Sequence, residues 1–132
     1  MWTTKKTVFI FFTALFMLAV GGQKASAQIP EEIIQSLKTG NEKTLSEYFN
    51  QNIELVVLDE DNVCSKAQAQ QIVGNFFSNN TPEGFSIIHQ GGKEGAQFVI
   101  GNLITSKGNF RIYFLLKKND GKEYIHQLRI EK

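Results

Sequence analysis

Residues 85–131 read FSIIHQGGKEGAQFVIGNLITSKGNFRIYFLLKKNDGKEYIHQLRIE, and this stretch decides the fold. Apolar and aromatic residues recur in it at every second position, and turns containing glycine interrupt it at 91–95, 106–108 and 119–121. The pattern predicts four strands, over 85–90, 96–105, 109–118 and 123–131. Connections this short cannot hold a crossover helix, so we expect the four strands to pair antiparallel.

Alternation along these strands assigns their side chains to two faces. We expect the inner face, on which helices lie, to hold Phe110, Ile112, Phe114, Leu116, Tyr124, His126, Leu128 and Ile130. We expect the outer face to hold Val99, Leu103, Arg111, Tyr113, Leu115, Ile125, Gln127 and Arg129. Apolar side chains interleaved with arginine are typical of protein interfaces, so the outer face predicts a homodimer, with a monomer as the alternative.

Two helices, one strand and a third helix are predicted between residue 29 and residue 80. Pro30 and Gly40 are typical of the two ends of a helix, and a second short helix follows and includes Phe49. The β-branched run 53–58 predicts a strand, which the acidic turn 59–62 ends. Ser65 followed by Gln68 forms a capping box, and apolar residues at helical spacing then continue to position 77.

The order helix, helix, strand, helix and four strands resembles the nuclear transport factor 2-like fold, in which a curved sheet wraps a long helix to make a cone. Five segments resemble one family of that fold, short exported bacterial proteins without an assigned function: 65–72 (SKAQAQQI), 88–91 (IHQG), 100–101 (IG), 108–111 (GNFR) and 127–130 (QLRI). The resemblance covers residues 29–131. It implies an α+β fold with three helices packed on a curved, mainly antiparallel sheet, and it carries over no catalytic residue. Proteins of similar fold often pair sheet to sheet.

The first 27 residues are typical of a cleaved export signal. Lys5 and Lys6 precede the stretch 8–20, in which only Thr13 is polar, and Ala25-Ser26-Ala27 is a small-x-small cleavage site. The apolar stretch is shorter than the ~20 residues that a membrane-spanning helix needs. We therefore expect a single domain over 28–132, located in the periplasm or outside the cell, with an uncleaved anchor as the alternative.

Charge and composition exclude several classes of function. Removal of residues 1–27 leaves 11 basic against 13 acidic residues, and no basic cluster remains to bind nucleic acid. Cys64, His89 and His126 are the only strong nitrogen or sulfur ligands, and they lack the spacing of a zinc site. The turn 59–62 fails the calcium-loop pattern, and Gly91-Gly92-Lys93 lacks the hydroxyl residue and helix of a phosphate loop. We expect no metal and no cofactor.

His126 is the one residue that the pattern offers for chemistry in the interior of the cone. With Tyr124, Phe110 and Phe114 it would line a cavity for a small apolar or amphipathic ligand. The sequence favours a non-catalytic binding module for such a ligand or for a partner protein. The alternatives are an enzyme of the isomerase or dehydratase type, with His126 as base and Tyr124 as hydrogen-bond donor, and a structural envelope component acting through a dimer surface.

Overall fold

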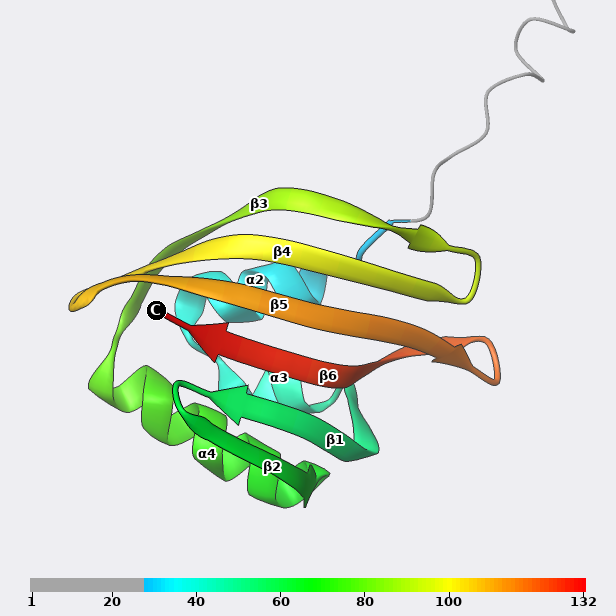
Figure 1. The fold of residues 1–132 in the computed structure, drawn as a ribbon, viewed down its shortest axis with the longest axis horizontal. Coiled ribbons are helices and arrows are strands. Elements are labelled where there is room, and N and C mark those ends of the chain that lie inside the picture. Colours follow the sequence, from blue (N-terminus) through cyan, green and yellow to red (C-terminus); the bar gives the residue numbers. More distant parts are fainter. Residues whose placement is uncertain (1–27) are drawn as a thin grey trace, which may run out of the picture.

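A curved six-stranded sheet with helices on its concave side makes up residues 28–132, which the computed structural model describes (Figure 1). The expected export signal, residues 1–27, lies outside the described residues. In chain order the elements are α2 (Glu31–Thr39), α3 (Glu42–Ser46), β1 (Phe49–Val57), β2 (Glu60–Ser65), α4 (Lys66–Asn79), β3 (Pro82–Lys93), β4 (Ala96–Thr105), β5 (Gly108–Asn119) and β6 (Lys122–Glu131). The α+β class and the four C-terminal strands are confirmed.

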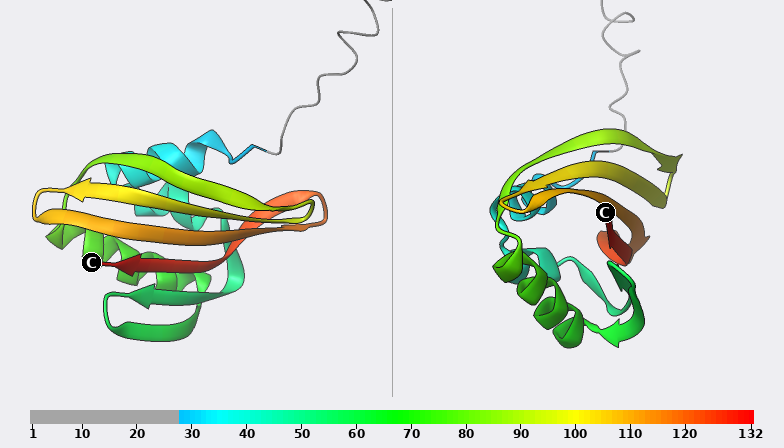
Figure 2. Two further views of the ribbon diagram at one scale, coloured as in Figure 1. Left: turned by 45° about the horizontal axis from the view of Figure 1, so that its top comes forward. Right: turned by 60° about the vertical axis from the view of Figure 1, so that its left-hand side comes forward.

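The strands lie side by side in the order β2-β1-β6-β5-β4-β3. The four C-terminal strands pair antiparallel with their sequence neighbours, as predicted, whereas β1 pairs parallel to β6. The strand β2 was not predicted: residues expected to form an acidic turn instead pair with β1 after a two-residue connection, Leu58-Asp59. Two turned views show the sheet curling around α4 (Figure 2).

The helix boundaries follow from the capping residues in the sequence. Pro30 precedes α2, and Gly40 ends it with a left-handed φ of 71°, which glycine adopts at low cost. The Ser65 hydroxyl accepts a hydrogen bond from the Gln68 backbone N–H, and the Gln68 side chain accepts one from the Ser65 N–H. This completes the predicted capping box of α4. The helix α3 ends at Ser46, so Phe49 begins a strand, contrary to the prediction that it is helical.

One continuous apolar core lies between the concave face and the three helices. The five residues predicted to share it, Phe76, Phe77, Phe110, Phe114 and Leu128, all belong to it. The rings of Phe76 and Phe110 meet edge to face with centroids 5.0 Å apart. No helix within residues 28–132 is long and apolar enough to span a membrane.

The predicted faces are wrong in two strands, β4 and the first part of β6. Val99 and Leu103 are fully buried and pair with Phe114 and Phe110, so they point into the core and not outward. Ile125 is also fully buried, because β6 has a bulge at His126: Ile125 pairs with Leu116 and Gln127 with Leu115, leaving His126 as an extra residue. A bulge shifts the alternation of side chains by one position. A face assigned by counting back from Ile130 is therefore the wrong one for residues that precede His126.

Candidate functional site

The four residues predicted to line a ligand cavity lie in two different environments. Phe110 and Phe114 are 4% and 0% exposed and pack inside the core. Tyr124 and His126 are only half-buried and do not belong to that core. Because the bulge separates the two pairs, the structure does not bring the four side chains together around one space.

His126 lies where two strands depart from regular pairing. Toward β5, His126 is the extra residue of the bulge in β6. Toward β1, Phe49 pairs with Ile125 and Glu54 pairs with Gln127, so residues 50–53 of β1 have only His126 opposite them. The Nε2 atom of His126 is buried and has no hydrogen-bond partner. Burial, together with the positive charge of Lys117, lowers the pKa of this imidazole, which favours its neutral form. Within residues 28–132 no carboxylate is hydrogen-bonded to Nε2 of this ring.

Tyr124 lies at the end of the sheet near the β5–β6 turn, where it borders two surface hollows. One, of about 300 Å³, is lined mainly by polar residues of β1, α4 and the turn. The other, of about 430 Å³, contains Tyr48, whose hydroxyl donates a 2.6 Å hydrogen bond to Glu32. That bond and partial burial raise the pKa of Tyr48 to about 12. The contact fastens α2 to the start of β1, so we assign Tyr48 a structural role.

The remaining candidates for chemistry are separated from one another. Cys64 is 7% exposed, and burial raises the pKa of its thiol, which keeps it protonated. His89 is exposed on β3, and the centroid of its ring lies 5.6 Å from that of Phe98. Within residues 28–132 no three His, Cys, Asp or Glu side chains are grouped so that they could hold a metal ion.

The outer face of the sheet carries the most organised set of half-buried and exposed side chains that core packing does not explain. Strand register places the following residues on it: Glu54 of β1; Phe98 and Ile100 of β4; Arg111, Tyr113 and Leu115 of β5; and Gln127, Arg129 and Glu131 of β6. Of the five residues predicted for a dimer face, Arg111, Tyr113, Leu115 and Gln127 lie here, and Ile125 does not. The three helices of residues 28–132 lie on the opposite, concave side (Figure 2).

Aromatic side chains follow one another across this face. The ring of Phe98 stacks on that of Tyr113 with centroids 6.4 Å apart and planes 23° apart. Phe98 reaches back over Gly91 of β3, where a Cβ atom would lie only 2.9 Å from its ring. His89, Phe98 and Tyr113 therefore form a strip across β3, β4 and β5, held by neighbours within the sheet.

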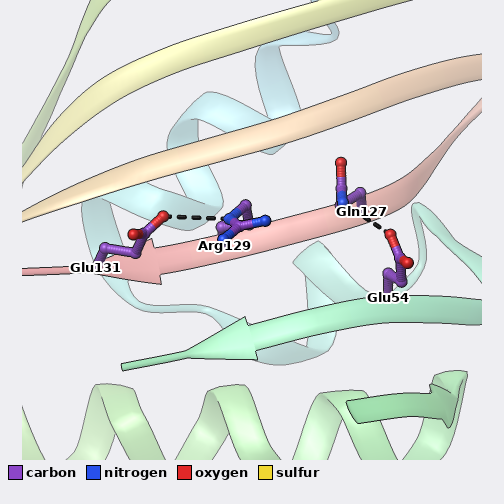
Figure 3. A network of polar contacts seen from close by, with 4 residues as sticks. All are labelled: Glu54, Gln127, Arg129 and Glu131. Atoms are coloured by element: carbon purple, nitrogen blue, oxygen red, sulfur yellow. Dashed lines mark hydrogen bonds and ion pairs between the residues drawn. The ribbon is translucent and has the colours of Figure 1, made fainter. Parts of the chain in front are cut away.

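Polar side chains on the adjoining strands are held in place by one another (Figure 3). The Gln127 amide donates a 2.7 Å hydrogen bond to Glu54, and the Arg129 guanidinium donates one of 3.1 Å to Glu131. A shallow hollow of about 380 Å³ lies between them and is lined by Ile100, Arg111, Tyr113, Gln127, Arg129 and Glu131. These contacts orient Glu54, Arg129 and Glu131 before any partner arrives.

Phe98 and Ile100 are the apolar members of this face that sequence reasoning missed. Both sets of alternating residues in 96–105 are apolar, so periodicity could not choose between Val99 with Leu103 and Phe98 with Ile100. The deciding signal was the pairing itself: residues opposite Phe110 and Phe114 in an antiparallel ladder must share their face.

Comparison with known proteins shows the family to which the chain belongs. The family model described as Domain of unknown function (DUF4783) matches residues 30–131. A DUF4783 protein of Bacteroides ovatus is 36% identical with a TM-score of 0.77, over 81% of this chain and 97% of that chain. One from Bacteroides uniformis is 35% identical with a TM-score of 0.76, over 80% and 97%. None of the curated proteins matches the chain significantly.

More distant structures show the fold alone. A protein of the Rd1NTF2 series is 13% identical with a TM-score of 0.64, covering 76% of this chain and 90% of that one. The predicted nuclear transport factor 2-like fold is confirmed, and no catalytic or binding role comes with it. The chain therefore belongs to the DUF4783 family, whose function is unassigned and whose fold is nuclear transport factor 2-like.

Proposed function

We propose that this protein is a non-catalytic protein-binding module, exported to the cell envelope, that binds its partner through the outer face of the sheet. The observation that carries the proposal is the organisation of that face. Aromatic and aliphatic side chains lie beside charged groups that are already held by neighbours, and the three helices leave them uncovered. Aromatic residues and arginine are enriched where proteins bind one another.

In this proposal the concave side of the sheet has a structural role. Its cone is filled by the aromatic core, in which Phe114 is fully buried and Phe110 nearly so. A small apolar ligand would have to displace these side chains. The filled core therefore favours a surface interaction over a buried reaction site.

Export is part of the proposal because of residues 1–27. Their apolar stretch and the cleavage site Ala25-Ser26-Ala27 would deliver residues 28–132 across the inner membrane. The exported protein would then bind its partner in the cell envelope, through a sheet face that is already exposed.

The test is site-specific photo-crosslinking in the cell that produces the protein. A benzophenone amino acid is introduced either at Ile100, half-buried on the outer face, or at Gln71, exposed on α4 on the other side of the molecule. We expect a discrete protein adduct from position 100 and none from position 71. Equal labelling at both positions, or no adduct from position 100 in a variant of unchanged thermal stability, would overturn the proposal.

A further inference from the structure

We infer that the partner covers the aromatic strip with a proline-rich segment in the polyproline II conformation, which crosses the strands from β3 to β5. The inference rests on the proposed function and names the chemistry of the partner. The strip consists of His89, Phe98 and Tyr113, one ring from each of three neighbouring strands. Three features of the face favour this kind of segment: the arrangement of the rings, the hydrogen-bonding groups beside them and the balance of charge.

The rings form a low aromatic surface that runs across the strands. The planes of Phe98 and Tyr113 differ by 23° and their centroids lie 6.4 Å apart, and the centroid of His89 lies 5.6 Å from that of Phe98. The Phe98 ring extends along the sheet, because it fills the position that a Cβ atom on Gly91 would take. A polyproline II chain advances about 3.1 Å per residue, so residues two apart are separated by about 6.2 Å and can contact successive rings. Aromatic surfaces of this kind are the usual docking sites of proline-rich segments.

The unused hydrogen-bonding groups beside the strip are donors. The only ion pair among residues 28–132 joins Arg129 to Glu131, and Glu54 accepts a hydrogen bond from Gln127. The carboxylates of the face are therefore engaged, and the guanidinium of Arg111, with five N–H donors and no acceptor, has no carboxylate partner. A segment that fits here offers carbonyl oxygens and brings few N–H groups of its own.

A proline-rich chain has this composition. Each proline carries a carbonyl group and no N–H, and polyproline II makes no internal hydrogen bonds, so its carbonyls are available to a donor. An α-helix bonds its carbonyls internally, and an ordinary extended strand laid on the face would cover N–H groups that find no acceptor. Tyr113 and Arg111 both line the hollow of about 380 Å³ beside the strip. A segment that leaves the ring of Tyr113 therefore passes directly over the donors of Arg111.

The charge balance of the face favours an uncharged segment. Arg111 and Arg129 are matched in number by Glu54 and Glu131, so a strongly acidic or basic segment would meet repulsion together with attraction. The edge strand β3, which the segment would cross, has no charged residue between positions 84 and 92. Proline residues meet neither attraction nor repulsion on this path, and their contact comes from ring packing and carbonyl hydrogen bonds.

The test measures binding of a fluorescein-labelled nonaproline peptide by fluorescence anisotropy, with protein expressed from its full-length gene and purified as the cell processes it. Tyr113→Leu removes a ring and should weaken binding on the order of 10-fold, and Arg111→Leu should weaken it several-fold. Gly91→Ala places a Cβ atom 2.9 Å from the Phe98 ring, which must tilt, so it should also weaken binding. Gly84→Ala is the matched control on the same strand, because its Cβ atom comes no closer than 3.9 Å to any atom, and it should leave binding unchanged.

Two competing ligands establish the chemistry that is recognised. An uncharged glycine-serine peptide of the same length should not displace nonaproline, and neither should cellohexaose, an oligosaccharide that can also pack on aromatic rings. Circular dichroism establishes that each variant is folded. No saturable binding of nonaproline, displacement by either competitor, or equal affinity of Gly91→Ala and Gly84→Ala overturns this inference. If nonaproline fails to bind but position 100 still yields a protein adduct, the proposed function stands without it; loss of that adduct removes the proposed function whatever the peptide does.

Discussion

Gly101→Ala should destabilise the protein, because the ring of Phe85 occupies the place that the new side chain would take. Gly101 lies on the concave face of β4, and a Cβ atom added there would lie 2.3 Å from Cζ of Phe85 and 2.9 Å from the backbone oxygen of Ser86. Carbon atoms pack comfortably at about 3.5–4.0 Å, so the ring must move by more than an ångström. Phe85 is only 6% exposed and has little room to do so.

The magnitude follows from two opposing effects. Overfilling a packed core costs about 1–3 kcal/mol, whereas replacing glycine by alanine restricts the unfolded chain and returns about 0.4–1 kcal/mol. We expect a net loss of about 1–2 kcal/mol in the free energy of unfolding. In a urea titration this lowers the midpoint by roughly 1 M, given the usual slope for a small domain.

Gly84→Ala is the matched control, since Gly84 lies in the neighbouring strand β3 and its added Cβ would come no closer than 3.9 Å to any atom, the Cδ1 of Ile104. It should be neutral or slightly stabilising. The double variant Phe85→Leu with Gly101→Ala should lose less than the sum of its two single changes, because the shorter side chain vacates the space. Unchanged stability of Gly101→Ala, or equal losses at both glycines, would refute the packing described for the concave face.

Three further changes test the core, the bulge and the first turn of α4. Phe114→Ala removes a fully buried ring and should cost about 3–5 kcal/mol in chemical denaturation; a loss below about 1 kcal/mol would mean that Phe114 is not in the core. The pKa of His126 is lowered on folding by burial and Lys117, so the unfolded chain binds the proton more tightly and stability should fall as the pH drops below the ordinary histidine value of 6.5. Thermal melts across this pH range should show a smaller drop in melting temperature for His126→Gln than for the original protein. Identical pH profiles of the two proteins would contradict the lowered pKa of His126. Ser65→Ala removes one half of the capping box and should lower stability by about 1 kcal/mol, which a urea titration detects; a neutral result would mean that the cap contributes nothing.

The local signals in the sequence predicted most helices and strands because each element carries its own boundary residues. The capping box at Ser65, the glycine at position 40 and the glycine-containing turns act over a few residues and need no tertiary information. The strand β2 escaped prediction for the opposite reason. Its residues are exposed except for Cys64, and all but Val63 and Cys64 are polar. They are extended because β1 offers a free edge to pair with.

The composition of the candidate site was predictable in part, and its geometry was not. Arg111, Tyr113, Leu115 and Gln127 follow from plain alternation. The bulge at His126 cannot be read from alternation, because Tyr124 and Ile125 are both large and apolar enough for the core. Because of this single extra residue, Ile125 points into the core and His126 lies outside it. The concave side therefore lacks the histidine that alternation placed there.

Oxidation by hydroxyl radicals tests most directly whether the outer face is a binding surface. The three tyrosines of residues 28–132 are all half-buried. Tyr113 stacks on Phe98 in the aromatic strip of the outer face, whereas Tyr48 and Tyr124 border the hollow near the β5–β6 turn and serve as internal references. Side-chain oxidation is compared by mass spectrometry between the protein in its native cell and the purified protein at nanomolar dilution. The account predicts that Tyr113 and Phe98 react several-fold less in the cell, as expected when an aromatic strip is covered by a partner, while Tyr48 and Tyr124 react equally in both samples. Equal oxidation of Tyr113 and Phe98 in the two samples would contradict it.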